Sequence, residues 1–336
     1  MTAVRMAGNR QLMTNPQTHE PPSTHGGSDA RPQRYQLGLD LGGTSVKAVA
    51  VTSAGESLER FHEPFELAEP LAFARAVRAV LHRATATLGV PAAVGLSAPG
   101  IAAKDGRSIA FMPGRFEGLE GLVWGEYLGR NEGVPVLNDA QSALLGEVWC
   151  GAALGARNVV LLTLGTGVGG AAMVDGRLLR GHTGKAGHLG HVSLDPTGER
   201  DICRTPGSLE DAIGNHNISR RSGGRFATTH DLVRAHESGD PFATAVWLRS
   251  VRALASAIAS FGNILDPEVV IVGGGVARSG DSLFRPLREF LDDWGWRPGG
   301  SGLRLVAAEL GEWAGACGAA WNAGQCAASG VSAASG

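Results

Sequence analysis

Histidines, a cysteine and several carboxylates gather in the segment 184–211, GKAGHLGHVSLDPTGERDICRTPGSLED. These residue types are the usual metal ligands of proteins, and they are also the usual acid–base and hydrogen-bonding groups. Their types alone leave three interpretations open: a metal site, a substrate site, or the remnant of either. The motifs elsewhere in the chain have to distinguish among them.

A glycine turn near residue 42 has the composition of a phosphate-binding loop. In DLGGTSVK, the carboxylate of Asp40 can organise Mg²⁺ through water, and the hydroxyl of Thr44 can donate to a phosphate oxygen. Gly42 and Gly43 let the backbone approach a phosphate, and Lys47 adds a cation unless it points to solvent. An ordinary glycine hairpin is the alternative for this motif taken alone.

Two further glycine turns have the same capacity. LGTGVGG places Gly165, Thr166 and Gly167 at the turn of a second hairpin, and EVVIVGGGVARSG runs from a strand through Gly274 and Gly275 toward a helix. Backbone N–H groups in such turns face an anion without obstruction, and a helix N-terminus adds the positive end of its dipole. The turns together indicate a site for the phosphates of a nucleotide.

A candidate proton acceptor follows an apolar strand in VPVLNDAQSALLGE, where Asn138 and Asp139 precede a helix. A carboxylate at a strand end beside a phosphate site can take the proton of an attacking hydroxyl. Asp is also a good helix N-cap, so a purely structural role for Asp139 is the alternative.

The elements expected around these motifs repeat along the chain. Residues 35–56 are predicted to form two strands joined by a glycine turn, followed by a helix over 70–89 and a buried strand over 91–100. Residues 158–179 again predict two strands around a glycine turn, and 268–291 predict a strand, a glycine turn and a helix. Two similar halves are therefore expected.

These motifs resemble the ROK family, named for its repressors, unknown frames and sugar kinases, within the actin, hexokinase and Hsp70 ATPase superfamily. The resemblance covers nearly all of residues 36–323. It rests on DLGGTSVK, LSAPG, MPGRFEG, LNDAQSALLGE, LGTGVGGA, GHTGKAGHLGHV, IVGGGVA and LGEWAGACGAA, in the family's order and approximate spacing. It implies an α/β fold of two ribonuclease-H-like lobes, the actin-like ATPase fold, with a cleft between them, and a homodimer.

The resemblance also implies an activity and the residues that perform it. The chain would be an ATP-dependent sugar kinase that uses Mg²⁺ and transfers the γ-phosphoryl group to a hydroxyl of a hexose or related sugar, with Asp139 as general base. The implied sugar contacts are Gly100, Asn138, His188, His191 and Glu210. The implied nucleotide contacts are Asp40, Gly42, Gly43, Thr44, Lys47, Gly165, Thr166, Gly167, Gly274 and Gly275.

The family's zinc motif is mostly replaced in this chain. Its patterns G-E-x-G-H and C-x-C-G-x-x-G-C-x-E hold a structural zinc through one histidine and three cysteines, of which His191 and Cys203 remain. Asp201 and Ser208 occupy the outer two cysteine positions. A mixed site of His191, Asp201 and Cys203 is chemically conceivable, but Ser is a poor zinc ligand, so we expect no zinc. Cys203 is then expected to be a small buried residue.

Two sugar-site positions also depart from the family. His188 stands where the family has Glu; a carboxylate accepts from two sugar hydroxyls, whereas a neutral imidazole offers one acceptor and one donor. Phe111, in FMPG, stands where N-L-P-G carries a sugar-binding Asn, and its side chain cannot hydrogen-bond. We therefore expect a substrate other than plain glucose, with packing of His188 against its own loop as the alternative.

Composition limits the partners and the compartment. A net charge of -2 and a pI near 6.6 disfavour nonspecific binding to nucleic acid or an anionic membrane. The four cysteines form no C-x-x-C pair, which suits free thiols in a reducing compartment. Without an apolar leader or a run of about 18 apolar residues, a cytoplasmic protein outside the membrane is expected.

The expected organisation has five parts. Residues 1–34 and 327–336 read as disordered tails because they lack apolar periodicity. The N-terminal lobe is expected over 35–141 and the C-terminal lobe over 142–312. A helix over 313–326 is expected to pack back on the N-terminal lobe.

Other functions remain open at this level. A catalytically silent sugar sensor fits the two sugar-site replacements. A transcriptional regulator does not, because the 34 residues before the first strand are too few and too irregular for a helix-turn-helix. Polyphosphate in place of ATP, the identity of the sugar and the hydroxyl phosphorylated are not decided by these motifs.

Overall fold

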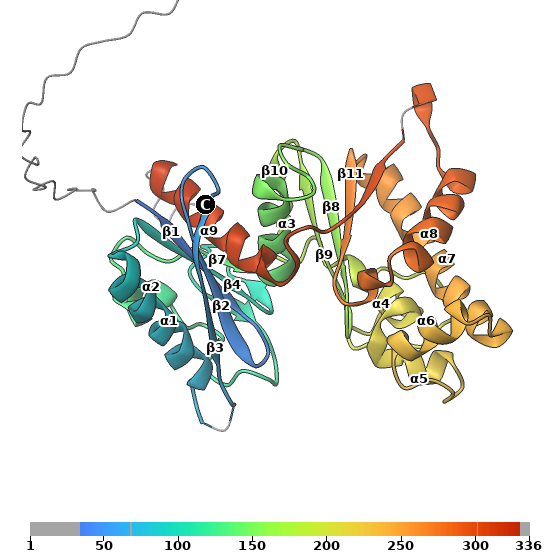
Figure 1. Ribbon diagram of the computed structural model, residues 1–336, viewed down its shortest axis with the longest axis horizontal. Helices are drawn as coiled ribbons and strands as arrows, with labels where there is room; N and C mark the ends of the chain where they lie inside the picture. The colour runs from blue at the N-terminus through green and yellow to red at the C-terminus, as the bar shows by residue number, and fades with distance from the viewer. Residues whose placement is uncertain (1–33, 68, 301, 330–336) are drawn as a thin grey trace, which may run out of the picture. The chain divides into compact units, whose positions relative to one another are not determined.

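The computed structural model describes residues 34–67, 69–300 and 302–329, and Figure 1 shows their course. Residues 1–33 of the tail expected over 1–34, and residues 330–336 of the tail expected over 327–336, lie outside the described residues.

Two mixed sheets share one strand order. The first sheet runs β3 (Ser57–Pro64), β2 (Ser45–Val51), β1 (Gln36–Leu41), β4 (Ala93–Ala98), β7 (Val136–Asn138). The second runs β10 (Arg177–Leu178), β9 (Val168–Val174), β8 (Val159–Leu164), β11 (Val269–Gly273), β12 (Arg304–Ala307). In each sheet, the central strand pairs antiparallel with the strand that follows it in the chain and parallel with its other neighbour. The prediction of an α/β protein with two similar halves is confirmed.

Helices and one small sheet complete the described residues. The helices are α1 (Ala72–Leu88), α2 (Trp124–Leu128), α3 (Asp139–Cys150), α4 (Leu209–Ile213), α5 (Ile218–Arg221), α6 (Thr229–Glu237), α7 (Pro241–Leu265), α8 (Asp281–Trp294) and α9 (Ala314–Ser329). The small sheet pairs β5 (Ile101–Ala102) with β6 (Ile109–Phe111).

The core of the second sheet follows the alternation of a β-strand. Val160, Leu162 and Leu164 of β8 join a buried cluster with α7, whereas Val159 and Leu161 join a cluster with α3. Because successive side chains of a strand point to opposite faces, helices cover both faces of this sheet. Burial on both faces explains why the sequence of β8, VVLLTL, is an almost continuous apolar run.

α7 is the one helix among the described residues that is long and apolar enough to cross a membrane by length and composition. Its Trp247, Val251 and Leu254 are fully buried, and they belong to the same cluster as strand β8. The apolar face of α7 is thus accounted for by the core against which it packs.

α9 joins the two sheets' helical layers, because it contacts β1, β4 and α3. A Cβ at Gly38 would lie 1.8 Å from the carbonyl oxygen of Ala316, so only glycine permits this close packing on β1. The helix continues to Ser329, so the second tail does not begin at 327 as predicted. Alanine has the highest helix propensity, which explains why this small-residue segment continues the helix.

The boundary expected between residues 141 and 142 falls inside α3, which is continuous and contacts β8 and β9 of the second sheet. The division into lobes at that point stays a prediction.

Candidate active site

Two carboxylates lie at one edge of the first sheet. β1, β4 and β7 are parallel, so Asp40, Ser97 and Asp139 lie where these strands end. The hydroxyl of Ser97 donates to Asp40 Oδ1 at 2.6 Å. Burial, and to a smaller extent the negative charge of Asp139, raise the pKa of Asp40 to about 6, against the lowering effect of the Ser97 hydrogen bond. The carboxyl ends of parallel strands are the usual ligand side of such sheets.

Asn138 holds Asp139 in place. Its Oδ1 accepts from the backbone N–H groups of Ala140 (3.0 Å) and Gln141 (3.3 Å), so Asn138 is the N-cap of α3. Its Nδ2 donates to the carbonyl oxygen of Gly100 at 2.9 Å. The alternative that Asp139 itself caps the helix is therefore wrong, because the residue before it occupies that position. Asn138 is buried, with both polar atoms bonded to protein.

Asp139 is the first residue of α3, and its Oδ1 accepts from the N–H of Ala140 at 2.8 Å. Although solvent reaches its side chain, the surrounding protein atoms desolvate the carboxylate and raise its pKa, against hydrogen bonds from Ala140 and Asn138. A raised pKa makes a carboxylate a better proton acceptor at neutral pH, as general-base catalysis requires.

The second glycine turn is held by the segment 210–216. The N–H of Asn215 donates to Gly165 O and that of His216 to Thr166 O, both at 2.9 Å. Glu210 Oε2 accepts from the N–H of Val168 at 2.8 Å. Glu210, expected as a sugar contact, thus lies directly against the second turn.

A buried arginine supports this segment. Arg221 Nη1 donates to the carbonyl oxygens of Gly214 (2.6 Å) and Asp211 (3.2 Å), and burial lowers its pKa to about 10. A guanidinium stays protonated at that value, so it continues to donate at neutral pH. No sequence motif marks this role, since the bonds are to backbone atoms.

A cavity of about 850 Å³ lies beside the second turn, and we call it the nucleotide cavity after the nucleotide contacts that the sequence predicts there. The sequence-predicted residues Gly165, Thr166 and Gly275 line it together. Gly274 has φ +86°, and a Cβ there would lie 2.3 Å from Leu164 O, so only glycine lets β11 turn this close to β8. Sequence motifs did not identify the other lining residues, which include Asn215, Thr228, Thr229, His230, Val233, Arg234, Glu237, Val276, Arg278 and Ser279.

The first glycine turn does not line the nucleotide cavity. The N–H of Gly42 donates to Ser45 O at 3.0 Å, which closes the turn. Arg115 Nη2 donates to Gly43 O at 3.1 Å and fixes the turn from outside. Lys47, expected at the phosphates, instead forms an ion pair with Glu312 at 2.6 Å.

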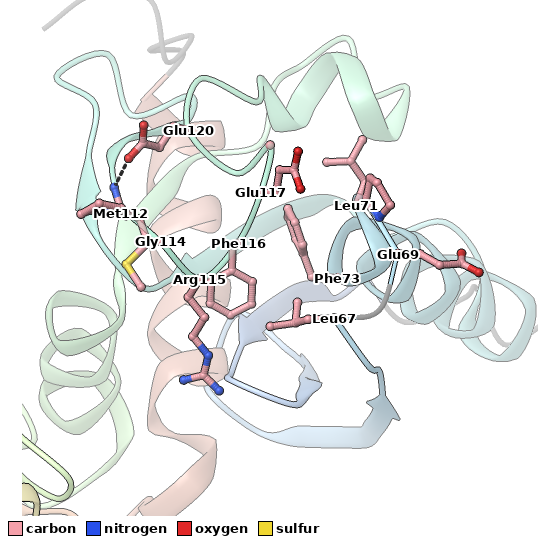
Figure 2. A pocket seen from close by; sticks show the side chains of 13 residues that line it. Leu67, Glu69, Leu71, Phe73, Met112, Gly114, Arg115, Phe116, Glu117 and Glu120 are labelled. Carbon is pink, nitrogen blue, oxygen red and sulfur yellow. Dashed lines mark hydrogen bonds between the residues drawn. The ribbon is translucent and has the colours of Figure 1, made fainter.

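The loop that carries Arg115 also borders a second cavity, of about 490 Å³ (Figure 2). Figure 2 shows Phe116 beside Phe73 and Arg115 directed away from Glu117 and Glu120. Glu120 Oε1 accepts from the N–H of Met112 at 2.6 Å, which shapes the loop just after Phe111. The side chain of Phe111 itself is 56% exposed, so an apolar ring is presented at a position expected to face the sugar.

In the histidine segment, a histidine is paired with a carboxylate. His191 Nδ1 lies 2.8 Å from Asp201 Oδ2, and Asp201 Oδ1 accepts from the N–H groups of Cys203 and Thr205. Within residues 34–67, 69–300 and 302–329, no group of three His, Cys, Asp or Glu side chains is arranged to hold a metal. The absence of zinc in the protein itself stays a prediction.

Cys203 is exposed, so the expectation of a buried residue is wrong. It lies in a turn closed by a hydrogen bond from Arg204 N to Asp201 O, and turns run over the protein surface.

His188 is half buried and immediately precedes the turn Leu189–His191. Burial lowers its pKa, and the positive charges of His191 and Lys185 lower it further. A neutral imidazole, with one donor and one acceptor, is therefore the form present near pH 7.

Comparison with known proteins decides the family. The model of the ROK family matches residues 36–325. The chain belongs to the ROK family. A glucokinase of Thermotoga maritima is 33% identical to this ROK chain over 315 residues, which cover 86% of the chain and 97% of that relative.

Solved ROK structures share the fold. The ROK hexokinase of Thermus thermophilus has a TM-score of 0.75 at 32% identity, covering 87% of this chain and 98% of that one. A ROK glucokinase of Streptomyces griseus, solved with glucose and AMPPNP, has a TM-score of 0.68 at 28% identity, covering 87% and 99%. The predicted fold of ROK kinases is confirmed, and this ROK chain is an ATP-dependent carbohydrate kinase.

Proposed function

We propose that this kinase transfers the γ-phosphoryl group of ATP to a hydroxyl of a hexose or related sugar, with Asp139 as general base. The observation that carries the proposal is the pair Asp40 and Asp139 at the ends of parallel strands, with Asp139 fixed by the Asn138 cap. A carboxylate held rigidly at a ligand-facing edge can accept a hydroxyl proton as the oxygen attacks phosphorus.

The nucleotide is assigned to the nucleotide cavity. Its volume of about 850 Å³ lies in the range of roughly 300–1,000 Å³ usual for cofactor sites. The N–H groups of Thr166 and Gly167 would face the phosphates, because those of Gly165 and Val168 already donate to Gly167 O and Glu210 Oε2. The Streptomyces griseus relative, solved with AMPPNP, supports an adenine nucleotide.

Asp40 is the residue whose chemistry fits Mg²⁺. Mg²⁺ in phosphoryl-transfer sites is held by one or two carboxylates plus water and phosphate oxygens. Only Oδ1 of Asp40 accepts a hydrogen bond from a described residue, which leaves Oδ2 for this purpose. When bound, the ion would neutralise charge on the phosphates, while Asp139 remains the proton acceptor.

The sugar is assigned to the side chains around Asp139. Gly100, held by Asn138, would meet the sugar with its backbone, while His188, His191 and Glu210 would supply hydrogen-bonding side chains. The exposed Phe111 would cover an apolar face of the ligand. With a neutral His188, this set favours a sugar other than plain glucose.

ADP release across hexoses, N-acylated amino sugars and polyols, with ATP and Mg²⁺, tests this proposal. We expect sugar-dependent turnover, with at least one acceptor preferred over glucose. Tight ATP and sugar binding without turnover for any acceptor would contradict it and favour a sugar sensor. Repeating the screen with polyphosphate would identify the donor.

A further inference from the structure

A third pocket, distinct from the nucleotide cavity and from the cavity of Figure 2, is lined by basic side chains. It measures about 420 Å³, and its lining includes Lys104, Gln141, Arg180 and His182. We call it the basic pocket. Its lining contains no carboxylate. A cavity of this size accommodates a small organic molecule.

Gln141 gives the basic pocket a polar wall. Its side chain is only 4% exposed, and its amide group forms no hydrogen bond to any other residue in the described parts of the chain. Only its backbone N–H is bonded, to Asn138 Oδ1. The amide atoms reach the open volume of the pocket, because Gln141 lines it and neither atom is shut off from solvent. The amide is therefore free to donate to, and accept from, a ligand in the pocket.

The basic side chains of the lining favour a ligand of negative charge. Within residues 34–67, 69–300 and 302–329, neither Lys104, Arg180 nor His182 forms an ion pair with a carboxylate. These three side chains come from two separate chain segments and line one small volume, and all three residues are solvent-exposed. An anionic group would bond to all of them.

The basic pocket adjoins the proposed sugar site through the chain itself. Its lining residue Ala102 lies two residues after Gly100, and Gln141 lies two residues after Asp139. A Cβ at Gly184, another lining residue, would lie 2.8 Å from Ala102 O, so the loop leading to His188 packs against β5 here. Three of the four segments that carry proposed sugar contacts thus border this pocket, and the segment of Glu210 does not.

We propose that the basic pocket binds the anionic group of a small molecule, a phosphate monoester or a carboxylate. Arg180 would donate two parallel hydrogen bonds to its oxygens, Gln141 would donate one, and Lys104 and His182 would supply charge. The anionic group has two possible sources: a substituent of the acceptor sugar, or a separate phosphate ester such as the product of the proposed reaction. Binding itself does not require catalysis.

Calorimetric titration of the full chain tests the pocket directly. The probes are inorganic phosphate, glucose 6-phosphate and glucuronate, at constant ionic strength, with and without AMPPNP to occupy the phosphate loops. We expect Arg180→Gln to weaken binding of at least one probe about tenfold, the loss typical of a charge-assisted hydrogen bond. Gln141→Leu and His182→Asn should weaken it several-fold.

Arg177→Gln is the matched control, because Arg177 is an exposed arginine three residues earlier that does not line the pocket. It should change binding less than twofold. Equal affinity for every probe in the wild type, Arg180→Gln and His182→Asn would overturn the proposal. So would an affinity loss of the same size in Arg177→Gln, because the effect would then be one of net charge.

Turnover distinguishes the two sources of the anion. If Arg180→Gln lowers kcat/KM for glucuronate and leaves that for glucose unchanged, the anionic group belongs to the acceptor. If only phosphate or glucose 6-phosphate binds in an Arg180-dependent way, the anion is a separate ligand. Because the titrations need neither ATP nor turnover, they support or overturn the pocket even if the proposed kinase reaction fails.

Discussion

At the scale of single residues, the site depends on carboxylates placed where ionisation is unfavourable. Asp40 lies in β1 and Asp139 begins α3, yet the negative charge of Asp139 helps to raise the pKa of Asp40. The motif DLGGTSVK predicted the first, and LNDAQ predicted the second. The effect of Asp139 on the pKa of Asp40 could not be predicted from the sequence, because it depends on which strands are neighbours in the sheet.

Asp40→Asn should stabilise the fold at high pH. The folded state holds the Asp40 proton more tightly, with a pKa of about 6 against 3.8 for an unperturbed aspartate. Ionisation of Asp40 therefore costs folding free energy as pH rises from about 4 to 6, and the full cost, up to about 3 kcal/mol, is present above that range. Thermal melts should show a higher Tm for the variant at pH 8 and little difference at pH 4.

Asp293→Asn is the control for this substitution, because Asp293 is exposed in α8. It should leave Tm unchanged at both pH values. A lower Tm for Asp40→Asn at pH 8 would contradict the raised pKa. The same variant should lose activity, since Asn is a poorer ligand for Mg²⁺.

Arg115→Ala should loosen the first glycine turn. Arg115 is exposed, and its one bond to this turn is to Gly43 O, so Tm should change little. The KM for ATP should rise several-fold, because the turn no longer holds one geometry for the phosphates. Steady-state kinetics would check this, with Arg107→Ala, which loses only a surface ion pair with Glu126, as control. Equal KM values in the two variants would count against a role for Arg115.

At the scale of elements, apolar and glycine patterns predicted most of what positions the site. The strands β1, β2, β4, β8, β9 and β11 and the helices α1 and α8 occur where the patterns indicate them. β3 was missed because its sequence, SLERFHEP, is charged and buries only Phe61 at the sheet edge. Edge strands with charged residues are common, since the charges discourage further pairing.

The segment 181–217 was the least predictable. It contains short helices and turns held by contacts such as Arg221 to backbone carbonyls, which follow no period. Sequence motifs identified Glu210 and His191 there, but not that Glu210 bonds the second glycine turn or that His191 pairs with Asp201.

Asn138 should have two separable roles at the start of α3. Asn138→Ala removes both the cap and the bond to Gly100, and it should lower the free energy of unfolding by about 1–3 kcal/mol. Asn138→Asp keeps an oxygen for the cap but loses the donor to Gly100. It should recover most of the stability and little of the activity. Urea denaturation paired with kinetics would measure this, and equal activity in the Asp variant and the wild type would show that the Gly100 bond is not needed.

At the scale of the whole molecule, the two sheets contribute different parts of the proposed site. The first sheet carries Asp40, and the second carries the glycine turn at Gly165. α9 packs on the first sheet and on α3, and α3 in turn packs on the second sheet. The chain of contacts from Asp40 to the second sheet runs through these two helices. The glycine motifs and the strand repeat made this architecture predictable, whereas the closeness of α9 to β1 required the glycine at 38.

Homodimer formation and a cytoplasmic location, both implied at the level of sequence, stay predictions. Sedimentation velocity on the full chain should give a species of twice the 34.7 kDa chain mass. A single species at the chain mass across concentrations would contradict it.

The identity of the general base is the centre of this account, and one comparison tests it most directly. Asp139→Asn removes the proton acceptor and leaves a side chain of nearly the same size at the first residue of α3. The control, Asp293→Asn, removes an exposed carboxylate. With the best acceptor sugar, kcat for Asp139→Asn should fall about 10²–10⁴-fold while the affinity for ATP, measured by titration with AMPPNP, stays within about threefold. A kcat for Asp139→Asn equal to that of Asp293→Asn would contradict the assignment of Asp139 as the base.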